Sequence, residues 1–127
     1  MTSYGFPRKL RLLTAGDFRY VFENTACKTY CQGFLLLAAP SRQDNTRLGF
    51  VIGKKHIKLA VMRNRYKRIF RESFRLNQHQ LPPVDILVLA IKGASQTSPE
   101  EISQNLDKTW QQLHRRLRKT SVHLSTK

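Results

Sequence analysis

The sequence predicts one α/β domain in which a mixed sheet and its helices form a two-layer sandwich. Three observations support this fold class. The chain has 127 residues, enough for a single modest core. Helical and strand-like patterns follow one another in the order α-β-β-α-β-α. The succession strand, helix, strand indicates a crossover unit, and two strands in a row indicate a hairpin, so the sheet is expected to be mixed.

The first predicted helix covers residues 15–24. Phe18, Val21 and Phe22 recur at the i, i+3, i+4 spacing of one helical face. Asp17 lies near the start, where an acidic side chain is favourable.

Two predicted strands follow, at residues 34–39 and 47–53. The first, "FLLLAA", is wholly apolar, and the second, "RLGFVIG", is rich in apolar and β-branched residues. The polar loop "PSRQDNT" between them predicts that the two strands pair as a hairpin.

The second half of the chain predicts helix, strand and helix. A basic helix at 59–77 ends before the prolines of "LPP", which cannot continue it. The strand at 85–91 is almost entirely apolar, as in a strand buried on both faces. Apolar residues at spacings of three and four predict a second long helix at 100–118. We expect one domain over 1–119 and a disordered tail over 120–127.

Charge is the dominant compositional feature. The chain has 23 Lys and Arg against 8 Asp and Glu, a net charge of +15 and a pI near 10.7. Such an excess repels itself unless a polyanion neutralises it. Nucleic acid is therefore the expected partner, with an anionic membrane as the weaker alternative.

A membrane or secreted location is not predicted. The longest apolar runs, at 34–39 and 86–91, are too short to span a bilayer, and charges interrupt the N-terminal segment before any signal-peptide core. We expect a cytoplasmic protein. Cys27 and Cys31 are then expected to be reduced thiols, because a zinc site needs more ligands at recognisable spacing.

The basic helix separates into two faces when its residues are placed at about 100° each. One side is predicted to be an apolar stripe that packs on the sheet, formed by Leu59, Met62, Tyr66, Ile69, Phe70 and Ser73. The opposite side is predicted to be a polar ridge of Asn64, Arg68, Arg71 and Arg75. Arg63 and Arg65 flank the stripe.

Two interpretations of this ridge compete: a solvated helix face and a grip on a polyanion. Solvated faces usually alternate charges and form i, i+4 ion pairs. Residues 47–75 hold ten Lys or Arg and one acid, Glu72, which is positioned to pair with Arg68. Lys54 and Lys55 extend the positive charge into the preceding loop. The imbalance favours the polyanion grip.

Catalytic side chains are not evident. Two-metal phosphodiester cleavage needs clustered carboxylates, and the eight acids show no metal-ligand spacing. The four histidines share no motif that would suggest acid–base catalysis. Aromatic side chains such as Phe18, Phe22, Phe34 and Phe50 have two interpretations, core packing or stacking on single-stranded RNA.

The same segments resemble a known family. "KLAVMRNRYKRIFRESFR" is similar to the Arg-Asn-Arg signature helix of the bacterial ribonuclease P protein subunit. The segments "FPRKLRLLTAGDFRYVF", "LGFVIGKKH" and "VDILVLAIKGA" agree in the same order, so that the resemblance covers residues 6–118.

The resemblance implies a fold and a division of labour. The fold would be a mixed sheet of about four strands with three helices and an unusual left-handed β-α-β crossover. The protein would bind ribonuclease P RNA, and that RNA would use magnesium to remove the 5′ leader from precursor tRNA. No metal, membrane or obligate protein partner is implied for the protein itself.

The resemblance also assigns residues. Those implied to lie against the catalytic RNA are Lys54, Lys55, Arg63, Asn64, Arg65, Lys67, Arg68, Arg71 and Arg75. Those implied to line a cleft for the single-stranded leader are Phe18, Phe22, Phe34 and Leu37. Leu37 stands where family members can carry an aromatic, so an apolar contact is expected there.

Two other functions fit the charge. A structural RNA-binding protein of the ribosomal type would need no leader cleft. A duplex-DNA binder would use the basic helix in the major groove.

Overall fold

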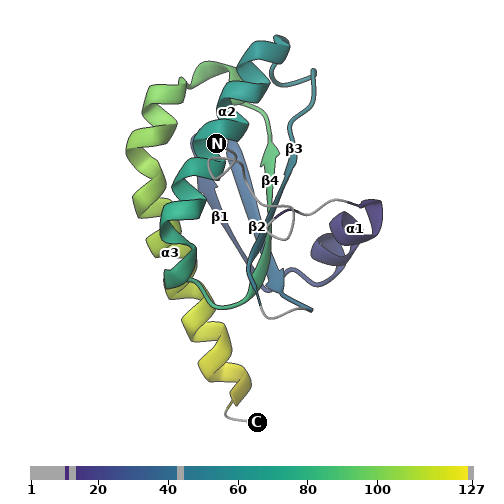
Figure 1. Cartoon of the computed structure of the whole chain (residues 1–127), viewed down its shortest axis with the longest axis vertical. Helices are drawn as coiled ribbons and strands as arrows, with labels where there is room; N and C mark the ends of the chain where they lie inside the picture. The colour runs from purple at the N-terminus through teal and green to yellow at the C-terminus, as the bar shows by residue number, and fades with distance from the viewer. Residues whose placement is uncertain (1–10, 12–13, 43–44, 126–127) are drawn as a thin grey trace, which may run out of the picture.

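A computed structural model describes residues 11, 14–42 and 45–125 of the chain. These residues form three helices and four strands, together with two short 3₁₀ turns (Figure 1). In chain order the helices and strands are α1 (Ala15–Glu23), β1 (Cys27–Cys31), β2 (Phe34–Pro40), β3 (Arg47–Val51), α2 (Ala60–Asn77), β4 (Val84–Ala90) and α3 (Pro99–Ser125).

The sheet has the order β1-β2-β4-β3, which corrects one expectation from the sequence. The predicted hairpin between 34–39 and 47–53 is wrong, because β4 lies between β2 and β3 and pairs with both. The hairpin partner of β2 is β1, whose short and partly polar sequence predicted no strand. Gly33 closes this hairpin with φ of 91°, and a Cβ there would lie 2.6 Å from the backbone of Ala94.

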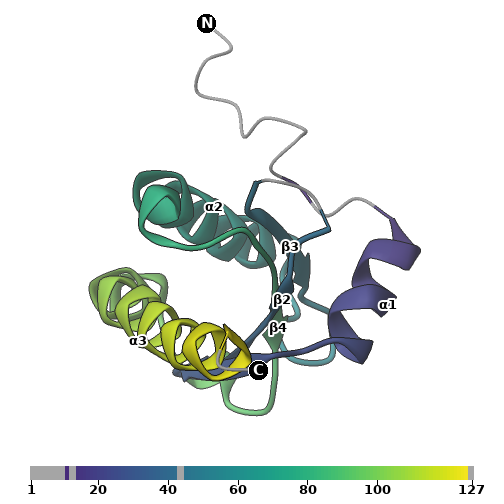
Figure 2. The ribbon, with the colours of Figure 1, turned by 90° about the horizontal axis from the view of Figure 1, so that it is seen from below.

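The mixed sheet and its crossover are confirmed. β3 and β4 are parallel and joined through α2, whereas β2 pairs antiparallel with both of its neighbours. With β3 and β4 running upward and α2 in front of the sheet, β4 lies to the left of β3 (Figures 1 and 2). The crossover is therefore left-handed, against the strong general preference for the right-handed form.

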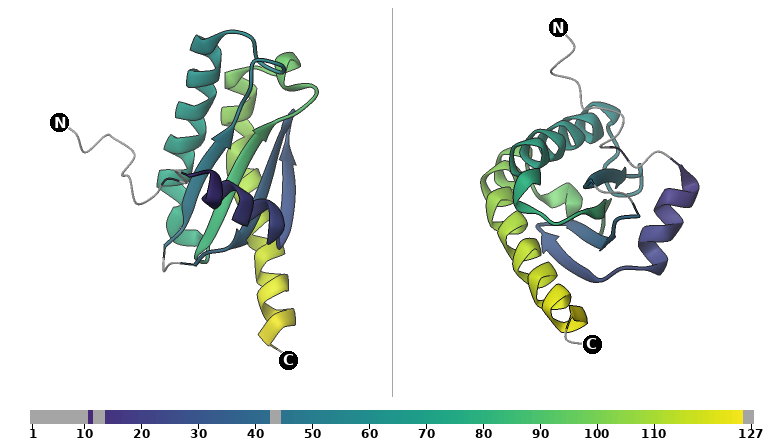
Figure 3. Two further views of the ribbon diagram at one scale, coloured as in Figure 1. Left: turned by 90° about the vertical axis from the view of Figure 1, so that its right-hand side faces the viewer. Right: turned by 60° about the horizontal axis from the view of Figure 1, so that its bottom comes forward.

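Helices cover the two faces of the sheet unequally. α2 and α3 lie side by side on one face, and α1 alone crosses the other (Figures 2 and 3). The main core lies under α2 and α3, where Phe70, Phe74 and Trp110 are at most 2% exposed. A smaller cluster under α1 contains Val21 and Leu87. The thin layer under α1 leaves part of the sheet available for other contacts.

Several element boundaries follow from local chemistry. The Thr14 hydroxyl accepts a hydrogen bond from the Asp17 amide, and the Asp17 carboxylate accepts one from the Thr14 amide, which caps α1. β4 is almost wholly buried, as predicted for residues 85–91. α3 extends to Ser125, beyond the predicted end at 118, so the segment predicted as a disordered tail, 120–127, overlaps its last turns and then leaves the described residues.

Candidate RNA-binding surfaces

The loop before α2 is held by Arg63. Its guanidinium donates hydrogen bonds to the carbonyl oxygens of Ile57 and Lys58, at 2.9 and 2.8 Å. α2 begins without a side-chain cap at Leu59, so Arg63 is the side chain that fixes the chain at this end. The loop leaves Lys54 and Lys55 exposed. Arg63 therefore positions the lysine loop, and its Nη1 group is already engaged in the free protein.

The two predicted faces of α2 are largely confirmed. Tyr66 and Phe70 are buried against the sheet, while Asn64, Arg68 and Arg75 are exposed on the other side. Two positions of the predicted stripe differ. Leu59 is 62% exposed because it lies at the first turn, beyond the sheet, and Phe74 is buried in the stripe although the prediction left it out.

The acids near α2 neutralise only part of its charge. Glu72 pairs with Arg75 at 3.3 Å, not with Arg68 as expected, because the i, i+3 geometry brings these side chains together. Arg65 pairs with Glu100 of α3 at 2.7 Å. Within the described residues Arg68 has no carboxylate partner. Arg68 is therefore the ridge cation most available to an external phosphate.

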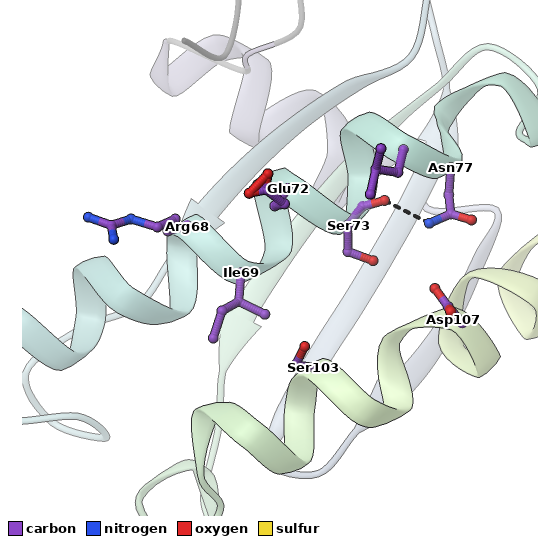
Figure 4. A pocket seen from close by; sticks show the side chains of 8 residues that line it. Arg68, Ile69, Glu72, Ser73, Asn77, Ser103 and Asp107 are labelled. Atoms are coloured by element: carbon purple, nitrogen blue, oxygen red, sulfur yellow. Dashed lines mark hydrogen bonds between the residues drawn. The ribbon is translucent and has the colours of Figure 1, made fainter. Parts of the chain in front are cut away.

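A groove between α2 and α3 lies next to this ridge (Figure 4). It has a volume of about 330 Å³ and is lined by Glu72, Ser73 and Asn77 of α2 and by Ser103 and Asp107 of α3. Arg68 also lines the groove, and Figure 4 shows its guanidinium directed away from both carboxylates. The sequence did not predict this groove, because it forms only where the two helices meet.

Arg71 and Lys67 of α2 line a pocket together with residues of β3 and α1. This pocket of about 200 Å³ is lined by Arg11, Phe18, Leu48, Gly49, Phe50, Lys67 and Arg71. The Arg71 guanidinium lies 5.2 Å from the centre of the Phe50 ring. Burial lowers the pKa of Arg71 from its usual value, and the charge of Arg11 lowers it further. Two half-buried like charges at one pocket favour an anionic ligand.

The residues assigned to the leader cleft are divided by the structure. Phe18 is half-buried in that pocket, and Phe22 is 50% exposed on α1. Leu37 lies on the sheet face under α1 but is buried beneath it. Phe34 lies on the opposite face with no exposed area, its ring 5.0 Å from that of Tyr66. Its assignment to the cleft is therefore corrected: Phe34 is a core residue.

A buried ion pair anchors α1 to the sheet, and sequence reasoning missed it. Arg47 of β3 donates to both carboxylate oxygens of Asp85 on β4, at 3.0 and 2.9 Å. Asp17 of α1 lies 3.5 Å from Arg47 and 3.3 Å from Arg42. The Tyr20 hydroxyl adds a hydrogen bond to the carbonyl oxygen of Pro40. The available signal was an acid, Asp85, inside an otherwise apolar strand.

Two further properties concern the described residues as a set. No three or more His, Cys, Asp or Glu side chains among them lie together as a metal site would require. None of the helices in this part of the chain combines the length and the apolar character needed to cross a bilayer. Cys27 and Cys31 are both free thiols.

Comparison with known proteins identifies similar chains. The family model described as "Ribonuclease P" matches residues 6–114. A ribonuclease P protein component of Chromohalobacter salexigens is 46% identical over 96% of this chain and 95% of its own length. One of Azotobacter vinelandii is also 46% identical, over 96% and 94%. The Staphylococcus aureus RNase P protein structure has a TM-score of 0.70 and 25% identity, and it covers 80% of this chain and 93% of its own.

Proposed function

We infer the role of this chain from one premise: it belongs to the ribonuclease P protein family, the protein component of the ribonucleoprotein endonuclease that processes tRNA. The chain is therefore an RNA-binding subunit of that enzyme, and its partner is ribonuclease P RNA. The finer assignment of its two surfaces, to the catalytic RNA and to the precursor tRNA, is our proposal.

The α2 ridge, defined as Asn64, Arg68, Arg71 and Arg75, contacts the catalytic RNA together with the lysine loop at Lys54 and Lys55. Support comes from the charge balance, because among the described residues Arg68 lacks a carboxylate partner and Arg71 lies against the Phe50 ring. Guanidinium groups suit bidentate contacts with phosphate oxygens. Arg63 contributes indirectly by holding the loop that carries the lysines.

The α1 side of the sheet holds the single-stranded 5′ leader of precursor tRNA. Phe22 offers an exposed ring, and Phe18 lines the pocket that also contains Lys67 and Arg71. This shared pocket is the observation that carries the proposal, because it joins an aromatic surface to the end of a cationic ridge. A protein built in this way can hold catalytic RNA and substrate leader at once.

The bond is cleaved by the RNA, which uses magnesium, in the bacterial cytoplasm. The protein's cations lower the repulsion between two polyanions, so the complex forms with less magnesium than the RNA needs alone. Protein side chains bind and orient in this scheme, and none of them transfers a proton.

Reconstitution tests this function. Adding the chain to a bacterial ribonuclease P RNA at low magnesium is expected to raise the rate of leader removal from precursor tRNA. Cleavage by the protein without RNA would contradict the division of labour. RNA binding without any effect on cleavage would instead indicate a structural RNA-binding protein, and preference for duplex DNA would indicate a major-groove binder.

A further inference from the structure

A pocket lies at the end of the molecule where the parallel strands β3 and β4 both finish. The connection from β3 to α2 and the connection from β4 to α3 lie at this end (Figure 1). We call it the entry pocket, and it is lined by residues 55–59, by Met62 and Tyr66 of α2, and by Ala94, Ser95 and Thr97. Its volume of about 400 Å³ is within the range of sites for small ligands. The carboxyl ends of parallel strands are also the usual place for a ligand in α/β sheets.

Hydrogen bonds hold both walls of the entry pocket in place. Arg63 donates to the carbonyl oxygens of Ile57 and Lys58, which fixes the wall formed by the loop. The Tyr66 hydroxyl donates to the carbonyl oxygen of Thr97 at 3.1 Å, which joins α2 to the connection between β4 and α3. The pocket is therefore preformed, and a ligand does not have to order these segments when it binds.

Part of the lining is suited to a phosphate group. α2 begins at this pocket with Leu59 as its N-cap, without a side-chain hydrogen bond to its first amides and without an acid in its first turn. Lys55 and Lys58 are exposed on the loop that leads into this turn. Helix N-terminal amides and lysine side chains both bind phosphate oxygens. None of the described residues that line the pocket carries a carboxylate.

The rest of the lining is mainly apolar. Ile57, Leu59, Met62 and Ala94 contribute apolar side chains to it, and Leu59 is 62% exposed. A site for phosphate alone needs no such side chains. Ser95 adds a hydroxyl group, which can donate to or accept from the polar edge of a base. The lining therefore combines an anion-binding part with an apolar part.

We propose that the entry pocket binds one nucleotide, with its phosphate at the start of α2 beside Lys55 and Lys58 and its base against Leu59 and Met62. A phosphate ion would leave the apolar side chains without a contact, and a neutral apolar ligand would leave the lysines without one. The nucleotide comes from one of two sources, an unpaired position of an RNA or a free mononucleotide, which offer the pocket the same chemistry. The inference goes beyond the proposed function, which places phosphates but no base at this end of α2.

Two variants change the apolar lining without removing a charge. Leu59→Ala shortens an exposed side chain, and Ser95→Trp fills the pocket from an exposed position. Val61→Ala is the matched control, because Val61 is 69% exposed on the first turn of α2 and does not line the pocket. Unfolding curves establish that each variant folds as the wild type does.

The first arm of the test measures binding to a bacterial ribonuclease P RNA across a salt series, and it rests on the proposed function. For an RNA nucleotide we expect Leu59→Ala and Ser95→Trp to weaken binding about five- to thirtyfold, and Val61→Ala to keep the wild-type affinity. The salt dependence of Leu59→Ala should equal that of the wild type, because the variant loses a base contact and no phosphate contact.

The second arm titrates the free protein with AMP, GMP, CMP and UMP. Binding of a mononucleotide that Leu59→Ala and Ser95→Trp both abolish, while their RNA binding is unchanged, assigns the pocket to a free nucleotide. If the wild-type protein does not bind ribonuclease P RNA, the proposed function fails, and this arm still tests the pocket. If the wild type binds the RNA and neither variant differs from Val61→Ala in either arm, the nucleotide pocket alone is overturned.

Discussion

The Arg47 guanidinium donates two hydrogen bonds to the Asp85 carboxylate, at 3.0 and 2.9 Å. The pair joins two parallel strands, β3 and β4, that lie far apart in the sequence. The Asp85 side chain has no exposed area and that of Arg47 has 9%. Asp17 of α1 reaches the same guanidinium at 3.5 Å, so this pair also sets where α1 lies on the sheet.

Breaking this pair should be strongly destabilising. Asp85→Ala leaves a buried cation with only the more distant Asp17, and we expect the free energy of unfolding to fall by about 3–5 kcal/mol in urea titrations. The double change Arg47→Met with Asp85→Leu is the control, because it removes both charges and should recover much of the loss. A loss of under about 1 kcal/mol in Asp85→Ala would mean that the pair is not a determinant of the fold.

Removing the Arg68 side chain from the ridge should weaken RNA binding selectively. We expect Arg68→Ala to reduce affinity for ribonuclease P RNA by about 1–3 kcal/mol and to lower the salt dependence by about one phosphate contact. Arg115→Ala removes the same charge from an exposed position on α3 and serves as the matched control. Filter binding across a salt series distinguishes the two, and equal losses would indicate nonspecific charge attraction only.

Substitutions of Phe22 and Phe34 should have different effects, the first on tRNA binding and the second on stability. Phe22 is half-exposed, so Phe22→Ala is expected to keep stability near that of the wild type and to weaken discrimination between precursor and mature tRNA. Phe34 packs against Tyr66 and Phe70, and Phe34→Ala should cost about 3–5 kcal/mol of stability. Thermal unfolding together with binding to both tRNA forms measures each effect. A selective binding defect in a stably folded Phe34→Ala protein would contradict its placement in the core.

The two thiols should react slowly while the chain is folded. Burial raises the pKa of Cys31 above its usual value, although a hydrogen bond with Thr109 opposes this, and burial likewise raises the pKa of Cys27. A raised folded-state pKa stabilises the fold below the unfolded pKa, and that contribution is lost as pH rises through the folded value. Iodoacetamide labelling at pH 8 should therefore modify the half-buried Cys27 before Cys31 and both faster in urea. Prompt labelling of Cys31 in the folded chain would refute its burial.

Local chemistry was enough to predict several elements. The 3.6-residue period placed Tyr66 and Phe70 on the buried side of α2 and Arg68 on the exposed side, because one amphipathic helix has only one apolar stripe. The apolar run of β4 predicted a strand buried on both faces, and the residue pattern at α1 predicted its start near Asp17. β1 escaped prediction because Lys28 and Thr29 weaken the apolar pattern of a short edge strand.

Only the tertiary structure decided which strands pair and on which face of the sheet each side chain lies. β4 enters between β2 and β3 although it follows both in the chain, since strand order depends on where the α2 crossover packs and not on sequence proximity. A strand that is apolar on both sides, such as β2, cannot indicate which alternate residues face which layer. The register therefore decided that Phe34 belongs to the core and that Tyr30 lies on the opposite face.

The sequence by itself determined the charge, the amphipathic helix and the family resemblance, because these depend on residue identity and spacing along the chain. The tertiary structure alone decided which cations have carboxylate partners and which aromatic rings are exposed to solvent. Those properties depend on how side chains are arranged in space. Glu72 pairs with Arg75, and Glu100 of α3 pairs with Arg65 of α2. α1 covers Leu37 but leaves Tyr30 exposed.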